Sequence, residues 1–590
     1  MPFVVGTIIA AVILWLSGAK RRREARRQTN NEVTTTMRTG LPGPETALGQ
    51  KARQVAEAQE GKLTSPPPVH GTARWGDADD APLLLDGNNL RTRFGHLGVQ
   101  LGTLMTPDGR DTGLPLVATY PGHLLTVAGT GQGKSATQIV ENLLSYVGSV
   151  VVVDPKGELY GLTAARRREM GRVFRLAPLA KQGEHSDRYN PLDELGDERE
   201  LGRRARHLAE MLIVRQGNKG AAEAAFFENE AINLLTAILM FVVELTETPA
   251  LRPGRTLSEV RRICSLPSMG GKTERDPLIR EYLEDVLRGM MASKHAYVRG
   301  QGARFIGYDP KLLGSFLSEL NSNLAFLDGH PGFAETTATS DFRFADLAHE
   351  PTTVYLSIPL KDLPTSFRYL RAMVGMAFAA MEERPDADFA SVLFILDEFP
   401  ALRDMEFMRE AVAQMRSSGA WFWFFVQDVA QLEATYGRWA NVFLSQTDHQ
   451  IFFGAVADAN TKRYISSALG VGTYAYRDAT ITWSQSVGMN DSENHSPLQL
   501  GGIGSGRNVG QTVNVSEPVL LAARPLLTPF EVGTYLSERQ PGETHPSTTI
   551  IFSKQAGGYP LRARRRHWRS ASSDQAPSPI LIMPRRKEAR

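Results

Sequence analysis

The chain has 590 residues, 42% of them hydrophobic and 22% charged, which is the composition of an ordinary globular protein and is too long for one small core. We therefore expect two or three folded units. The formal net charge is only +2, so any nucleic-acid-binding surface must be local rather than a property of the whole chain. The single cysteine, Cys264, excludes an internal disulfide and a cysteine-rich metal site.

The N-terminus predicts a membrane anchor over residues 1–27. The 17 residues from Phe3 to Ala19 carry no charge, and a helix of that length spans roughly 25 Å. Four basic residues, Lys20–Arg23, follow at once, so the positive-inside rule places the N-terminus outside and the rest of the chain in the cytoplasm. A cleaved signal peptide or a peripheral helix is the alternative. The polar residues 28–70, which end in Ser65-Pro66-Pro67-Pro68, predict a linker.

From Gly71 onward, apolar runs alternate with helical patterns. The runs are continuous rather than alternating, which is typical of a parallel sheet covered on both faces and therefore of an α/β fold. We predict strands at Leu124–Ala128, Val150–Asp154, Thr353–Pro359, Val392–Asp397, Trp421–Val426 and Gln450–Phe453.

Residues 200–335 have helical periodicity and few strand-like runs, with predicted helices at Phe226–Glu244 and Leu278–Met291. We expect an all-alpha domain inserted between a first part of an α/β domain, 71–199, and a second part, 336–555. The segment Gly270–Thr273 imitates a phosphate loop, but no strand precedes it, and we interpret it as an ordinary loop.

Leu124–Ser135 is the most informative segment, because an apolar strand runs into a glycine loop and then a helix. The loop matches G-x-x-x-x-G-K-[ST] except that Ala128 takes the first position, and its backbone N–H groups would cradle phosphate oxygens. Lys134 would reach the β- and γ-phosphates and the Ser135 hydroxyl would ligate Mg²⁺. The predicted nucleotide-binding residues here are Gly129, Thr130, Gly131, Gln132, Gly133, Lys134, Ser135 and Ala136. A glycine-rich turn without a ligand is the alternative.

Asp397 and Glu398 come directly after the predicted buried strand that begins at Val392. Acids at the carboxyl end of such a strand face the crevice where open α/β sheets bind ligands. Asp397 would hold Mg²⁺, and Glu398 would act as general base toward water. A solvated acidic turn is the alternative, and it loses weight because the phosphate loop is present. Together the two motifs predict a P-loop ATPase that uses ATP and Mg²⁺.

The C-terminal part is less distinctive. Gly501–Gly510 predicts a flexible hairpin or an exposed loop. Residues 556–590 predict a basic tail whose last twenty or so residues are disordered. Its arginines would contact phosphate or lipid head groups, or form a solvated edge; they are Arg562, Arg564, Arg565, Arg566 and Arg569, around Trp568.

Several further strings have the arrangement of a known family. They are Gly71–Trp75, Val153–Leu159 (VDPKGEL), Tyr189–Asp193, Leu396–Leu402 (LDEFPAL), Gln427–Glu433 and Tyr436-Gly437. Together the strings resemble the type IV secretion coupling ATPases of the TraG/TraD type, the motors of bacterial conjugation, over roughly residues 70 to 550. The resemblance implies a RecA-like motor interrupted by an all-alpha domain, assembled as a hexamer at the inner membrane with ATP sites between subunits.

The resemblance also assigns roles to single residues. It implies that Gln427 senses the γ-phosphate and that Arg416 is an arginine finger toward the neighbouring subunit; the alternatives are a core-edge amide and a surface charge at a helix end. Asp154 and Lys156 would contact the nucleotide or the subunit interface. The family usually has two N-terminal membrane helices, whereas one apolar run is visible here, which affects the expected periplasmic contacts with the channel.

The function that the resemblance implies is delivery of DNA, with its attached relaxase, to a type IV secretion channel, driven by ATP hydrolysis. Pore loops would track the DNA backbone without reading sequence, and the helical insertion would recruit cargo. Export of protein effectors alone and an ATP-dependent membrane docking scaffold remain alternatives. A chromosome-segregation motor of the FtsK type is a further rival on fold, but it lacks the VDPKGEL and LDEFPAL strings in this arrangement.

Overall fold

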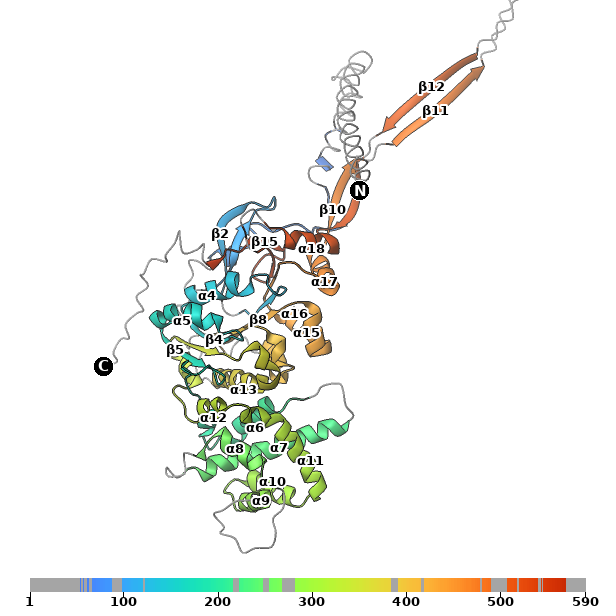
Figure 1. Cartoon of the computed structure of the whole chain (residues 1–590). Helices are drawn as coiled ribbons and strands as arrows, with labels where there is room; N and C mark the ends of the chain where they lie inside the picture. The colour runs from blue at the N-terminus through green and yellow to red at the C-terminus, as the bar shows by residue number, and fades with distance from the viewer. Residues whose placement is uncertain are drawn as a thin grey trace, which may run out of the picture. The chain divides into compact units, whose positions relative to one another are not determined.

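A computed structural model describes residues 66–86, 98–119, 122–215, 222–247, 254–267, 282–383, 391–414, 419–477, 480–489, 507–516, 519–539 and 545–568, with a few isolated positions. These residues separate into two units, one formed by 74–470 with 525–590 and the other by 1–73 with 471–524. The larger unit contains both predicted motifs (Figure 1).

The larger unit is built on an 11-stranded mixed sheet with the order β2-β1-β15-β14-β9-β3-β8-β7-β4-β6-β5. Its parallel part runs from β9 to β5, and β14, β15, β1 and β2 extend it in antiparallel fashion. The strands of the parallel part are β9 (His449–Phe453), β3 (Leu124–Val127), β8 (Ala420–Val426), β7 (Val392–Leu396), β4 (Ser149–Val153), β6 (Thr352–Leu356) and β5 (Arg172–Leu176). Six of these seven were predicted; β5 was not.

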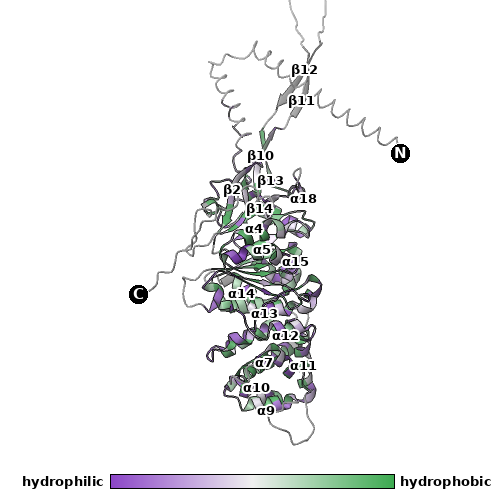
Figure 2. Cartoon of the chain, turned by 60° about the vertical axis from the view of Figure 1, so that its left-hand side comes forward, coloured by the Kyte–Doolittle hydropathy of each residue, from purple (hydrophilic) through white to green (hydrophobic). Residues whose placement is uncertain are grey.

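The sheet is buried on both faces because alternate residues of each strand join different cores. In β4, Val150 and Val152 pack with one cluster, whereas Val151 and Val153 pack with the other. The first cluster includes residues of α4 (Val140–Ser145) and α5 (Glu158–Met170); the second includes α13 (Leu363–Glu382), α15 (Val429–Tyr436) and α16 (Ala440–Gln446). Figure 2 shows hydrophobic residues gathered along the sheet and the helices beside it.

The described residues between β5 and β6 form helices and no strand, although β5 and β6 are neighbours in the sheet. They form a helical layer below the sheet in Figure 1. The elements are η2 (Pro191–Leu195), α6 (Leu201–Leu212), α7 (Ala222–Leu245), α8 (Leu257–Cys264), α9 (Leu283–Met291), α10 (Ala296–Ile306), α11 (Pro310–Leu324), η4 (Ala325–Asp328), α12 (Pro331–Thr336) and η5 (Phe344–Ala348).

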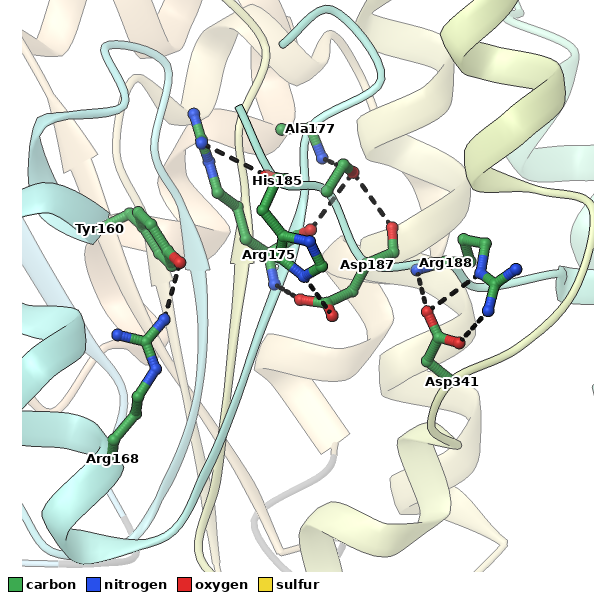
Figure 3. A network of polar contacts seen from close by, with 9 residues as sticks. Tyr160, Arg168, Arg175, Ala177, His185, Asp187, Arg188 and Asp341 are labelled. Carbon is green, nitrogen blue, oxygen red and sulfur yellow. Dashed lines mark hydrogen bonds and ion pairs between the residues drawn. The ribbon is translucent and has the colours of Figure 1, made fainter. Parts of the chain in front are cut away.

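Hydrogen bonds join the two connections that lead into and out of this helical segment. The Arg188 guanidinium pairs with Asp341 at 2.7 Å, and the main-chain N–H of Asn190 donates to the Ser340 hydroxyl at 3.0 Å. On the β5 side, Asp187 accepts from the main-chain N–H of Arg175 and contacts the His185 ring, at 2.7 and 2.9 Å (Figure 3). The two connections between the helical segment and the sheet are therefore held side by side by these hydrogen bonds.

The remaining strands are β1 (Val99–Met105), β2 (Asp111–Ala118), β14 (Thr548–Ser553) and β15 (Leu561–Arg564). Their position corrects the predicted basic tail at 556–590, because β15 pairs with both β1 and β14 inside the sheet. Leu561 and Ala563 are fully buried, so alternate residues of this segment are part of the core. Residues 569–590 lie outside the described residues. The other helices are α3 (Pro82–Asp86), η6 (Leu360–Asp362), η7 (Phe399–Leu402), α14 (Glu406–Gln414), η8 (Gly437–Trp439), α17 (Ala459–Leu469) and α18 (Pro529–Ser537).

The smaller unit corrects the predicted boundary of the second α/β part. The described residues of 471–524 do not join the main sheet but form two two-stranded sheets, β10 (Val471–Arg477) with β13 (Val519–Pro525) and the antiparallel pair of β11 (Thr480–Met489) with β12 (Arg507–Ser516). Ten residue pairs between Thr480↔Ser516 and Met489↔Arg507 give β11 and β12 an unbroken register. Gly501–Gly506, the first part of the predicted glycine-rich loop, lies outside the described residues.

One helix among the described residues, α7, is long and apolar enough to cross a membrane, but 78% of its most apolar window is buried inside the protein. A helix of this kind is common in the core of a globular domain. The predicted anchor at Phe3–Ala19 and the predicted loop at Gly270–Thr273 lie outside the described residues.

Candidate nucleotide site

The site lies at the carboxyl ends of four neighbouring strands, β3, β8, β7 and β4. The parallel register brings Val127 opposite Val426, Leu396 opposite Phe424 and Val153 opposite Leu396. The residues that follow these strand ends therefore gather at one edge of the sheet. They are the phosphate loop after β3, Gln427 after β8, Asp397 and Glu398 after β7, and Asp154 after β4.

The phosphate loop turns by means of two glycines. Gly131 and Gly133 have φ values of +72° and +83°, which a side chain rarely adopts. Ala128 and Gly129 are not among the described residues with positive φ, so the loop accepts Ala128 without backbone strain. Thr130 is exposed at the outside of the turn.

The helix after the loop starts with a π-helical segment, η1 (Ser135–Ile139), and continues as α4. Its first residues are Ser135 and Ala136, which are half-buried at the N-terminal end of the helix, where N–H groups and the helix dipole favour anions. The Nζ atom of Lys134 is buried and donates to the carbonyl oxygen of Ala128 at 3.0 Å. The lysine thus spans the loop with its ammonium group inside the turn.

Gln132 connects the loop to the neighbouring strand. Its Oε1 atom accepts a hydrogen bond from the main-chain N–H of Ala455, just after β9, at 3.1 Å. Gly454 allows this approach, because a Cβ atom at that position would lie 2.6 Å from the Cβ of Gln132. Sequence reasoning placed Gln132 in the loop but missed Gly454, whose role depends on the pairing of β9 with β3.

Asp397 is 5% exposed, and its pKa is raised to about 6 by burial and then by the adjacent Glu398 carboxylate. The positive charges of Lys134 and Lys156 act in the opposite direction on the same carboxyl, and Asp154 adds to the rise. The structure therefore brings Lys134, Lys156 and Asp154 within electrostatic range of Asp397. A carboxylate with these neighbours is suited to hold a divalent cation beside phosphates.

Glu398 has a left-handed backbone, with φ 55° and ψ 44°, at the start of η7. This conformation costs a non-glycine residue about 1 kcal/mol or more and is concentrated at functional sites. Its Oε2 atom accepts a hydrogen bond from Nε2 of Gln427 at 3.2 Å. The main-chain N–H of Gln427 in turn donates to Oε1 of Gln431 at 2.9 Å, which fixes the start of α15.

Asp154 has a structural role that sequence reasoning did not separate from nucleotide contact. The residue is 1% exposed, and its Oδ2 atom accepts from the main-chain N–H of Tyr160 at 2.9 Å, in the first turn of α5. Burial raises the pKa of Asp154 above its ordinary value, and the hydrogen bonds from the turn offset only part of this rise. Asp154 therefore organises the VDPKGEL turn and contributes negative charge to the site. Arg416 lies outside the described residues.

Within the described residues, no cluster of three or more His, Cys, Asp or Glu side chains could hold a metal ion by itself. The side chains predicted to hold Mg²⁺ at this edge of the sheet are one hydroxyl and one carboxylate, Ser135 and Asp397. This set fits Mg²⁺ that keeps water ligands and is shared with substrate phosphates, rather than a metal in an all-protein cage.

The fold and the site together define a P-loop nucleoside triphosphatase fold with a mixed α/β sheet. The sequence profile of the family described as "Type IV secretory system Conjugative DNA transfer" matches residues 78–500. The chain belongs to this family, and the resemblance inferred from the sequence strings is confirmed.

Curated relatives agree with this assignment. Protein VirD4 of Rhizobium radiobacter is 29% identical over 501 residues, covering 83% of this chain and 66% of its own length. Conjugal transfer protein TraG of Escherichia coli is 30% identical over 424 residues, covering 66% of this chain and 63% of its own length. The chain thus spans somewhat less than two thirds of the length of these relatives.

Solved structures show the same fold. The conjugative coupling protein TrwBΔN70, in an unbound form, superposes with a TM-score of 0.52 at 16% identity and covers 81% of this chain and 91% of its own. TrwB in complex with ADP and Mg²⁺ superposes with a TM-score of 0.51, also at 16% identity, and covers 79% and 89%. The α/β fold predicted from the sequence is confirmed at this level.

Proposed function

We propose that this protein is a membrane-anchored ATPase that couples ATP hydrolysis to the delivery of DNA into a type IV secretion channel. The observation that supports it most is the convergence of the phosphate loop, Asp397, Glu398 and Gln427 at one sheet edge, in a chain of the conjugative DNA transfer family. Each of these groups has a defined task in phosphoryl transfer to water.

ATP would bind with its β- and γ-phosphates in the loop 128–135. The loop N–H groups, Lys134 and the N-terminus of η1 would neutralise phosphate charge, while Ser135 and Asp397 would hold Mg²⁺. When bound, Mg²⁺ supplies positive charge to the transferring phosphoryl group. TrwB, which has this fold, has been solved in complex with ADP and Mg²⁺, and this supports binding of a nucleotide with Mg²⁺ here.

Glu398 would act as the general base for the attacking water, since its carboxylate follows Asp397 directly and is oriented by Gln427. Gln427 links this base to the start of α15 and would report the presence of the γ-phosphate to that helix. We keep Arg416 as the proposed arginine finger that reaches the ATP of a neighbouring subunit, because a guanidinium stabilises charge that develops in the transition state.

The motor is proposed to be RecA-like, with the helices between β5 and β6 as an inserted all-alpha domain that recruits the relaxase and other cargo. We propose a homohexamer with DNA in a central pore, held by backbone contacts without sequence readout. The apolar segment Phe3–Ala19 would anchor the chain in the inner membrane in a single pass, with the motor in the cytoplasm.

The full-length chain, purified in detergent, provides the test. Steady-state hydrolysis of ATP is measured with and without single- and double-stranded DNA, beside Lys134→Ala and Glu398→Gln. We expect DNA to raise the rate severalfold, both substitutions to abolish it, and the stimulation to fall steeply with salt. A rate of hydrolysis that DNA does not change would favour export of protein cargo alone. A chain that binds ATP without hydrolysing it would be a docking scaffold.

A further inference from the structure

Arg565 is a buried charge whose described contacts include no carboxylate. The residue follows β15 directly and is 3% exposed. Its Nε atom donates to the Thr549 hydroxyl at 2.8 Å, its two terminal nitrogens donate to the Thr137 hydroxyl and the Pro546 carbonyl, and its guanidinium lies 3.4 Å from the centre of the Phe453 ring. No carboxylate oxygen among the described residues lies within 4.0 Å of it, as the ion pairs show.

Such a charge is unusual, because burying an arginine without an acid is expensive unless an anion shares the site. Burial lowers the pKa of Arg565 to about 9, and the Glu543 carboxylate, which pairs directly with Arg564, acts in the opposite direction, so the group stays cationic at neutral pH. The neutral acceptors around it satisfy its N–H groups but not its charge. A second anion near the guanidinium would therefore be favoured.

The contact with Thr137 leads directly to the phosphate loop. Thr137 is in η1, and both its main-chain N–H and its hydroxyl donate to the carbonyl oxygen of Gly133, at 2.9 and 2.8 Å. Because the Thr137 hydroxyl accepts from Arg565 while it donates to Gly133, the two hydrogen bonds strengthen each other.

The Gly133 carbonyl and the Lys134 N–H belong to one planar peptide unit and point in opposite directions. A hydroxyl that holds the carbonyl on the helix side therefore holds the Lys134 N–H toward the inside of the loop, where phosphate oxygens bind. His545 also packs close to Gly133, since a Cβ atom added to this glycine would lie 3.0 Å from the Cδ2 atom of His545. The C-terminal segment thus lies close to the loop at Gly133 and contacts the helix that follows the loop at Thr137.

We propose that Arg565 is a positioning residue of the nucleotide site: through Thr137 it fixes the Gly133–Lys134 peptide, and its charge attracts the phosphates of a bound nucleoside triphosphate from behind the loop. This inference rests on the proposed nucleotide binding. The proposal gives the paired strands β14 and β15 a role in nucleotide binding, because the segment that extends the sheet also positions the phosphate loop.

The test measures binding of a fluorescent ATP analogue with Mg²⁺ to the full-length chain in detergent. The variants are Arg565→Gln, Arg565→Lys, Thr137→Val, the double variant Arg565→Gln/Thr137→Val, and Lys134→Ala as the reference for a lost site. Arg566→Gln is the matched control, since Arg566 is the next residue, has a half-exposed side chain and lies 3.9 Å from Asp111.

We expect Arg565→Gln to raise the Kd about tenfold, as loss of a hydrogen bond to a charged group does, and Arg566→Gln to stay within about twofold. Thr137→Val should weaken binding as well, and the double variant should be little worse than Arg565→Gln, because Arg565 acts through the hydroxyl. Arg565→Lys should fall between the wild type and Arg565→Gln, because it keeps the charge and loses the forked hydrogen bonds.

Melting temperatures without nucleotide separate positioning from simple structural support. A wild-type chain that binds the analogue, with Arg565→Gln and Thr137→Val equally tight and merely less heat-stable, would overturn the positioning role and leave the proposed function intact. A wild-type chain that does not bind the analogue at all would overturn the proposed function and this inference together.

Discussion

Nε2 of Gln427 donates a hydrogen bond to Oε2 of Glu398 at 3.2 Å, which joins the ends of two adjacent parallel strands, β8 and β7. Glu398 holds a left-handed backbone at this point. The amide thus orients a carboxylate whose backbone is already strained, and both residues lie in turns directly after paired strands. Two predictions concern this pair.

Glu398→Gln should leave ATP binding within a few-fold of the wild type and lower the rate of hydrolysis by roughly 10²–10⁴-fold, the contribution of a general base. The amide keeps the size of the side chain and removes its ability to take a proton. Phosphate release under saturating ATP measures the rate, and a fluorescent analogue measures binding. Glu406→Gln is the control, because Glu406 is an exposed acid of α14 that pairs with Arg215 at 3.1 Å. Equal loss in both variants would contradict the assignment of Glu398.

Gln427→Glu should shift the acidic limb of the kcat–pH profile to higher pH. Two carboxylates at hydrogen-bond distance cannot both ionise easily, so the substitution raises the pKa of the pair and delays formation of the base. Gln427→Ala removes the donor without adding a charge and should lower kcat with no such shift. Profiles from pH 5 to 9 distinguish the two variants. An unshifted limb in Gln427→Glu would contradict the contact between the two side chains during the reaction.

We predict that binding of Mg²⁺ at Asp397 depends on pH near 6. Burial and the Glu398 carboxylate raise its pKa to about 6, so protons compete with the cation below that value. The apparent affinity of the ATP-loaded chain for Mg²⁺ should fall by up to about tenfold for each pH unit below 6 and stay level above 7. Titration with Mg²⁺ at constant ATP, followed by a fluorescent nucleotide, measures this.

Asp397→Asn is the control for that prediction, and it should also change the stability of the folded chain in a definite direction. The pKa of the Asp397 carboxyl is higher in the folded chain than in the unfolded chain, so the protonated carboxyl favours folding. Its contribution to stability is full below about pH 4 and is lost as the pH rises through about 6. The amide should therefore raise the melting temperature of the nucleotide-free chain at pH 7 while removing the pH dependence of Mg²⁺ binding. A lower melting temperature would contradict the burial argument.

Gly454→Ala should lower both stability and nucleotide affinity. A side chain at φ +76° is strained, and its Cβ would lie 2.6 Å from the Cβ of Gln132 and displace the loop. We expect a loss of about 1–3 kcal/mol in the free energy of unfolding, measured by chemical denaturation, and a weaker Kd for ATP. Gly437→Ala is the matched control, since its φ is +54° and nothing lies within 4 Å of a Cβ there. It should lower stability alone; unchanged Kd in Gly454→Ala would remove the link to Gln132.

The sequence alone was sufficient for six of the seven strands of the parallel core, β5 being the exception, and for the order of the motifs along it. A run such as Val392–Leu396 is buried on both faces, so its apolar character does not depend on distant residues, and the acids that follow it must lie at a strand end. The same local reasoning places Gly131 to Ser135 at a strand-to-helix turn. These features depend on residues that are adjacent in the chain.

The C-terminal strands could not be recognised in the same way, although Leu561 and Ala563 alternate with Arg562 and Arg564, the pattern of a half-buried strand. The density of arginine indicated a solvated tail instead. In the structure each of these arginines has a particular contact: Arg562 lies 4.2 Å from the centre of the Trp75 ring, Arg564 pairs with Glu543, and Arg565 is buried. The pairing of β15 with β14 and with β1, which is more than 450 residues away, places the arginines at these contacts.

The chemistry of this protein was therefore readable from its sequence, because a phosphate loop and a strand-end acid pair are local patterns whose residue types are set by the reaction. The tertiary structure alone decided which groups support that chemistry: Gln427 on Glu398, Gly454 beneath Gln132, and Arg565 behind Thr137. Each of those contacts joins residues from different elements, 29 to 428 positions apart in the chain. Their residue types are common on protein surfaces, so burial and sheet register, rather than identity, give them their roles.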